Sequence, residues 1–347
     1  MKNKRLLAAS MAFILSAASL TGCSGGNNTT NGSSSGETAS KETNAESAGT
    51  TEAEAPKGEK TVLTVWHTWG AGPGTDAMEK VVEMYNQSND KNVEINLQFV
   101  ANKASGNTQT MDKLMASIAA GNPPEIALLD NFQIPTWAQQ DALVKLDDLM
   151  AASGLSFDGI YDWASNGSHY KDAVYSIPYN GDTRALFYNK DLFAAAGLDP
   201  EDPPSTIEEL NEAAEKLTIM DGNTYKQVGF IPWLNAGKPI YTWGWNFGGD
   251  FYDADTNTLT VAKAENIEAL QWEVDFAEKF GGKSFIEFAN GLGSGAQDAF
   301  VTGQVAMAVR GNFDIANMAQ YNPDLNYGIC PIPSKVEGEH ATWAGGW

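Results

Sequence analysis

From residue 61 onward, short apolar runs alternate with segments of helical periodicity, and this alternation limits the fold more than any other feature. Residues 62–66 are an apolar run, and residues 93–99 alternate between apolar and polar side chains, as strands do. Apolar residues recur at helical spacing within 78–85 and 111–118, and a third apolar run follows at 125–129. Strands alternating with helices predict an α/β fold with a largely parallel sheet.

The same rhythm restarts in the second half of the chain. Ser205 and Glu208 have the spacing of a capping box at the start of a helix. We therefore expect two α/β lobes, residues 60–183 and 184–347, joined near residues 180–184. In the second lobe, strands are expected at residues 185–188, 305–309 and 325–330, and helices at 207–217 and 267–277.

The first 22 residues have the three parts of a secretory signal: a basic start, an apolar stretch and small residues at the end. The apolar stretch, residues 6–20, is shorter than the roughly 20 residues of a membrane span. Residues 20–23 resemble the lipobox of bacterial lipoproteins. This resemblance implies cleavage before Cys23, acylation of that residue with palmitate, and anchoring at the outer face of the cell membrane.

Residues 23–59 are predicted to be a disordered linker that begins with the lipidated cysteine. They are rich in Gly, Ser, Thr, Asn, Ala and Glu and contain no aromatic residue, so they cannot bury enough apolar surface to fold. A chain of this composition behaves as a flexible coil.

Charge and missing motifs exclude several classes of function. The 22 Lys and Arg against 44 Asp and Glu give a formal net charge of −22, which disfavours binding to nucleic acid. No phosphate-binding loop or HExxH motif is present, and His67, His169 and His340 are far apart, so we expect no cofactor, metal site or catalytic residue. Cys330 lies in an apolar run and is expected inside a strand. An enzyme that cleaves glycans with two acids stays open as an alternative.

Aromatic residues gather where strands are expected to end, beside polar residues. In an open α/β sheet, ligands bind beyond the carboxyl ends of the strands. Indole faces pack against the C–H faces of a sugar ring, while amides and carboxylates pair with its hydroxyls. We therefore predict a sugar site. The candidate residues from this argument are His67, Thr68, Trp69, Asn131, Phe132, Trp233, Trp243, Trp245, Trp343 and Trp347.

Several stretches resemble the extracellular solute-binding proteins of carbohydrate ABC transporters, the maltose-binding-protein-like family. They are residues 64–67 (TVWH), 119–126 (AAGNPPEI), 175–179 (YSIPY), 185–193 (ALFYNKDLF) and 307–312 (MAVRGN). Their order matches that of the family. The resemblance implies a two-lobed, periplasmic-binding-protein-like fold with a hinge and a ligand cleft between the lobes.

The same resemblance implies further site residues and partners. Asp182 falls at the position of a ligand-binding acid, and Phe313 falls where an aromatic ring stacks on sugar, next to Asn312. We expect a monomer that captures a mono- or oligosaccharide and docks on the permease subunits of an ABC importer. A binding protein of the same fold for a non-sugar solute is the other alternative.

The family continues beyond the last strand with additional helices. We therefore interpret the sequence as truncated at its C-terminus, with the first lobe incomplete.

Overall fold

The computed structural model describes residues 60–100 and 108–347. The predicted signal peptide (1–22), lipidated Cys23 and linker (23–59) lie outside the described residues. Within the described part, none of the helices is both long enough and apolar enough to cross a membrane.

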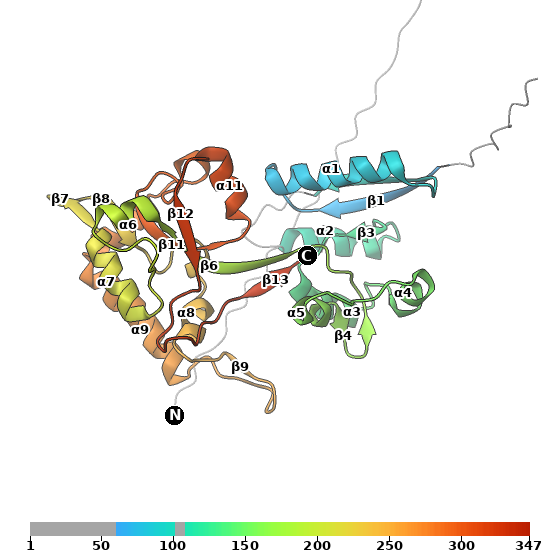
Figure 1. The fold of residues 1–347 in the computed structure, drawn as a ribbon. Helices are drawn as coiled ribbons and strands as arrows, with labels where there is room; N and C mark the ends of the chain where they lie inside the picture. The colour runs from blue at the N-terminus through green and yellow to red at the C-terminus, as the bar shows by residue number, and fades with distance from the viewer. Residues whose placement is uncertain (1–59, 101–107) are drawn as a thin grey trace, which may run out of the picture. The chain divides into compact units, whose positions relative to one another are not determined.

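The first lobe, residues 60–180, contains a small parallel sheet in the order β2-β1-β3 (Figure 1). The central strand β1 (Thr61–His67) pairs in parallel with β2 (Val93–Phe99) and with β3 (Ile126–Ala127). Helices α1 (Pro73–Ser88) and α2 (Thr108–Ala119) connect these strands. The strand–helix alternation of the sequence, and the parallel pairing inferred from it, are confirmed in this lobe.

The rest of the first lobe is built from short elements. They are α3 (Ile134–Gln139), α4 (Asp147–Ser153), α5 (Asp162–Gly167), β4 (His169–Tyr170) and β5 (Ala173–Val174). The buried core of this lobe is small, because only four residues form its fully buried cluster. These are Leu114, Leu129, Ile134 and Trp137.

The second lobe is built on a six-stranded sheet with the path β12-β6-β11-β8-β7. The strands on this path are β6 (Gly181–Asn189), β7 (Ile219–Asp221), β8 (Thr224–Phe230), β11 (Val305–Gly311) and β12 (Tyr327–Cys330), and the sixth strand, β13 (Ala344–Gly346), pairs with β6 off the path. Only β11 and β8 are parallel, whereas β6 is antiparallel to both β11 and β12. The expectation of a largely parallel sheet is therefore wrong for this lobe, partly because the two-residue turn between β7 and β8 permits only antiparallel pairing.

Helices and one hairpin complete the second lobe. They are α6 (Lys190–Ala195), α7 (Ile207–Leu217), α8 (Ile240–Asn246), α9 (Ala264–Lys279), α10 (Lys283–Asn290), α11 (Asp314–Tyr321), β9 (Tyr252–Asp253) and β10 (Thr258–Leu259). All seven residues of β11 are buried, so this strand forms the centre of the lobe's core.

The capping box of α7 lies one residue later than the sequence spacing predicted. The Thr206 hydroxyl accepts a hydrogen bond from the Glu209 backbone N–H (3.1 Å), and the Glu209 carboxylate accepts one from Thr206 (3.1 Å). Glu209 also accepts from the backbone of Ser205 (2.8 Å), so the predicted N-cap residue is held by the motif without being the cap itself. Starting at Ile207, the helix turns Leu210 toward the core.

The last strand, β13 (Ala344–Gly346), pairs with the first residues of β6, Gly181–Thr183. Strand β6 therefore runs through the predicted lobe boundary at residues 183/184 without a break. After β13, the carbonyl oxygen of Trp347 accepts a hydrogen bond from the Tyr179 N–H (2.7 Å). This pairing brings the aromatic end of the chain back to the segment that enters β6.

Candidate ligand-binding site

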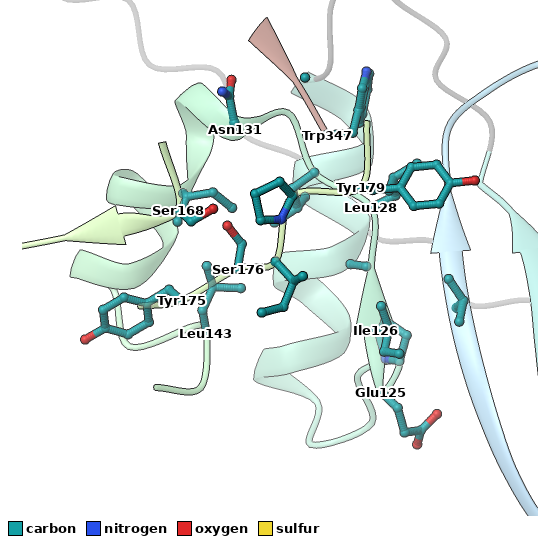
Figure 2. Close-up of a pocket in the computed structure, with 18 of the residues that line it drawn as sticks. Glu125, Ile126, Leu128, Asn131, Leu143, Ser168, Tyr175, Ser176, Tyr179 and Trp347 are labelled. Carbon is teal, nitrogen blue, oxygen red and sulfur yellow. The ribbon is translucent and has the colours of Figure 1, made fainter. Parts of the chain in front are cut away.

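A cavity of about 780 Å³ in the first lobe is lined by residues of α1, α2 and the sheet, by residues 175–180, and by Gly346 and Trp347. Figure 2 shows Glu125 toward one end of it and Tyr179 and Trp347 toward the other. Most of its lining is aliphatic, and a hydroxyl-rich ligand would leave many of its polar groups unpaired there. Its size therefore does not make this cavity the best candidate for a sugar.

A smaller cavity of about 340 Å³ in the second lobe has a more suitable lining, and we call it the second-lobe pocket. It combines aromatic rings with amide, hydroxyl and guanidinium groups, which is the mixture that fixes a polar ligand with apolar faces. The residues that line it are Arg184, Asn235, Ala236, Pro239, Tyr241, Thr242, Phe313, Asp314 and Trp343.

Arg184 is held between two aromatic rings at the edge of this pocket. Its guanidinium carbon lies 5.1 Å from the ring centroid of Phe313 and 4.6 Å from that of Trp343, which are cation–π distances. Its Nη1 atom lies 3.1 Å from Oδ1 of Asp182 and donates a hydrogen bond to the carbonyl of Thr183 (3.2 Å). Only 16% of the Arg184 side chain is exposed. Arg184 was not among the predicted site residues. The sequence signal that could have identified it is its position two residues after the predicted binding acid, Asp182.

Two glycines allow the rings to take these positions. A Cβ atom on Gly311 would lie 2.3 Å from the Phe313 ring, and one on Gly345 would lie 2.4 Å from the Trp343 ring. Carbon atoms do not approach this closely, so any larger residue at either position would move the ring. Gly311 is the last residue of β11 and Gly345 is the middle residue of β13. The rings of Phe313 and Trp343 therefore lie directly against the backbone of strands β11 and β13.

Asp182 and Tyr241 lie in the same electrostatic environment. The pKa of the Tyr241 hydroxyl is raised above its usual value, mainly by burial. The charge of Arg184 lowers this pKa and that of Asp182 raises it, both by less than burial does. The Oδ1 atom of Asp182 is buried and, despite its 3.1 Å distance from Arg184, accepts no hydrogen bond of normal geometry from the described residues.

A third cavity, about 380 Å³, lies between the loop that follows β1 and the start of α11. Trp69 and Phe313 both line it, so Phe313 borders two cavities. The Trp69 ring also lies 5.9 Å from the rings of Tyr179 and Trp347. The structure thus brings together predicted residues from widely separated parts of the chain: Trp69 with Trp347 and Phe313, and Phe313 with Asp182 and Trp343 through Arg184.

Of three other predicted residues, two are buried and the third, Trp233, is half-buried. His67 is 3% exposed, and burial lowers the pKa of its imidazole. Trp243 is completely buried in α8 and donates a hydrogen bond to the carbonyl of Pro232 (3.0 Å). Trp233 packs edge-on against Phe285 with 5.7 Å between the ring centroids. None of these three residues lines the cavities described above.

The remaining predicted residues lie near the surface but are spread out. Asn131 lines the large apolar cavity, whereas the Phe132 side chain is 66% exposed. Thr68 is half-buried in the loop after β1. Trp245 packs against the pocket residue Tyr241 in a tilted arrangement with 4.9 Å between the ring centroids. The exposed residue Asn312 connects the end of β11 to β6 because its backbone N–H donates to the carbonyl of Thr183 (3.2 Å).

Two α/β lobes with a pocket lined by aromatic rings and polar groups are typical of solute-binding proteins. The sequence pattern of the bacterial extracellular solute-binding proteins matches residues 71–347, and the chain belongs to this family. The resemblance inferred from the motifs is therefore confirmed.

Individual relatives agree with this placement. The sn-glycerol-3-phosphate-binding periplasmic protein UgpB of Escherichia coli K12 is 24% identical over 288 residues, which cover 81% of this chain and 63% of the relative. This chain thus spans about 63% of the length of that curated relative.

Two solved structures share the fold. The structure of CpMnBP1 with mannobiose bound is 34% identical with a TM-score of 0.70, covering 83% of this chain and 73% of that one. The maltose-bound MalE3 of T. maritima is 22% identical with a TM-score of 0.65, covering 83% and 71%. The two-lobed α/β fold expected from the sequence is confirmed by these similarities.

Proposed function

We propose that this protein captures a mono- or oligosaccharide outside the cell membrane and delivers it to the permease of an ABC importer. The observation that carries the proposal is the second-lobe pocket, where the rings of Phe313 and Trp343 meet the polar groups of Asn235, Tyr241 and Arg184. The mannobiose-bound relative at 34% identity supports the same class of ligand.

Capture and delivery need no covalent chemistry. A ligand shifts an equilibrium between open and closed arrangements by as much as it prefers the closed one. The named relatives are binding proteins, which supports a binding role over glycan cleavage. A lipid on Cys23 would hold the protein at the membrane, where it would act as a monomer.

A phosphorylated small solute is the second candidate, because the Escherichia coli relative binds sn-glycerol 3-phosphate by name. The charges of the second-lobe pocket weigh against it. Arg184 is the only Lys or Arg among the residues that line the pocket, and it is already paired with Asp182. A phosphate group would meet no free cation there.

Thermal unfolding of the full-length protein with a ligand panel tests the proposal. A ligand at 100 times its Kd stabilises the folded state by about 2.7 kcal/mol, which raises Tm by about 4–5 °C for roughly 290 folded residues. We expect this rise with at least one neutral saccharide, and its loss in Trp343→Ala. The control Tyr161→Ala removes a ring that is 77% exposed and should keep the rise.

A rise with amino acids, peptides or metal ions, and none with any saccharide, would contradict the proposal. New reducing ends appearing when the protein is incubated with glycans would favour an enzyme instead.

A further inference from the structure

We propose that the ion pair between Asp182 and Arg184 sets the selectivity of the second-lobe pocket, so that it accepts uncharged ligands and rejects phosphorylated ones. This inference rests on the proposed sugar-binding function and adds a residue-level determinant to it.

The charges around the pocket occur in two groups, one neutral and one with a net charge of −1. The first is Arg184 with Asp182, 3.1 Å apart. The second joins Asp314 to Arg310 at 3.3 Å, and Arg310 is itself only 3% exposed and bound to Asp298 at 3.0 Å. Among the described residues that line the pocket, Arg184 and Asp314 carry the only charges, and each has its counter-ion in place. The pocket therefore has no excess positive charge to offer an anion.

Arg184 is also restrained so that it does not turn freely toward an anion. Its guanidinium lies against the rings of Phe313 and Trp343, and its Nη1 atom is engaged by Asp182 and by the carbonyl of Thr183. A phosphate that binds the remaining N–H groups of Arg184 would lie close to the carboxylate of Asp182, which is 3.1 Å from the same guanidinium. That carboxylate would repel the phosphate at short range.

A neutral polyhydroxy ligand faces no such conflict. Its hydroxyl oxygens can accept from guanidinium N–H groups that are not used within the pair, and an uncharged hydroxyl is not repelled by the carboxylate of Asp182. The ion pair stays intact while Arg184 gains a new acceptor. The same two side chains thus favour hydroxyl groups and disfavour phosphate.

Calorimetric titration of the full-length protein measures this selectivity directly. The neutral probes are mannobiose and maltose, and the anionic probes are sn-glycerol 3-phosphate and glucose 6-phosphate. For the wild type we expect the better neutral probe to bind at least 100-fold more tightly than either phosphate. For Asp182→Asn, which releases Arg184 at constant shape, we expect weaker neutral binding and at least a tenfold gain in affinity for a phosphate.

Two further variants separate selectivity from folding. Arg184→Gln removes the cation and should weaken neutral binding without any gain for the phosphates. Asp172→Asn, an exposed acid of the first lobe, should leave both affinities unchanged. Circular dichroism melts confirm that each variant is folded before it is titrated.

The outcomes distinguish this inference from the function on which it rests. Neutral sugar binding in the wild type, with no gain of phosphate binding in folded Asp182→Asn, overturns the inference alone. Phosphate binding by the wild type that equals its sugar binding also overturns the inference alone. A wild type that binds none of the neutral sugars overturns both.

Discussion

Glu273 on α9 is the clearest case in which burial changes the chemistry of a single residue. One of its carboxyl oxygens is buried without a hydrogen-bond partner among the described residues, and burial raises the pKa of the carboxyl to about 7. The unfolded chain, with a pKa near 4.5, loses this proton first as the pH rises. The folded state then binds more protons than the unfolded state, so stability falls as the pH rises from about 4.5 to about 7.

Replacing Glu273 with Gln should remove this pH dependence, because Gln resembles the protonated acid at every pH. We expect the Tm values of Glu273→Gln and wild type to agree below pH 4.5 and to diverge toward pH 7, with the variant a few degrees more stable. Calorimetric melts between pH 4 and 8 provide the measurement. A variant that is less stable than wild type at pH 8 would refute the assignment.

Cys330 shows a related effect of burial. The thiol lies in β12 as the sequence predicted, and burial raises its pKa to about 12. A thiol with this pKa is protonated at neutral pH and is therefore a poor nucleophile.

Between elements, a cluster of ion pairs among Arg310, Asp298 and Asp314 links β11 to α11. Arg310 lies at the end of β11, Asp314 begins α11, and Asp298 precedes the buried residues Ala299, Phe300 and Val301. Two guanidinium nitrogens of Arg310 bind the carboxylate of Asp298 at 3.0–3.3 Å. The cluster therefore fixes the start of α11 relative to the central strand.

Removing Arg310 leaves two carboxylates without a counter-ion in a largely buried position. We expect Arg310→Ala to lower the free energy of unfolding by about 3–5 kcal/mol, measured by urea denaturation. The matched control is Lys226→Ala, whose partner Asp221 is exposed, with an expected cost below about 1 kcal/mol. Equal losses in the two variants would show that the buried cluster is no stronger than a surface pair.

Helix α9 shows what periodicity predicts and what it does not. The spacing of Ile267, Leu270 and Val274 predicted a helix, and a helix is present. Yet these three side chains are 47–58% exposed, while Ala269 and Phe276 are buried. The local pattern determines that a helix forms, but the shape of the neighbouring sheet and of α8 selects the side that faces the core.

At the scale of the whole molecule, the excess of acids is the dominant electrostatic feature. With 44 Asp and Glu against 22 Lys and Arg, repulsion between carboxylates opposes the compact state. Salt screens exposed charges, since the Debye length falls to about 10 Å at 0.1 M.

We therefore expect Tm to rise by a few degrees when NaCl increases from about 0.02 to about 0.2 M at pH 7.5, where the carboxylates are ionised. KCl should have the same effect because screening depends on ionic strength rather than on the identity of the cation. A Tm that stays constant or falls with salt would mean that favourable ion pairs outweigh the repulsion.

The sequence alone determined the local elements and the family. Apolar spacing predicted β1, β2, α2 and β11 close to their observed bounds, since these patterns are set by neighbours within one element. Family motifs in a fixed order predicted the two-lobed fold. These are properties that a chain carries before it folds.

Only the tertiary structure decided which residues meet in the pocket and which are buried. Arg184 lies more than a hundred residues from Phe313 and Trp343, so no local pattern joins them. His67 and Trp243 carry the same chemistry as cleft residues, yet the fold places them in the interior. The reason is physical: the exposure and partners of a side chain depend on the packing of distant elements, whereas its helix or strand preference depends on its neighbours in the chain.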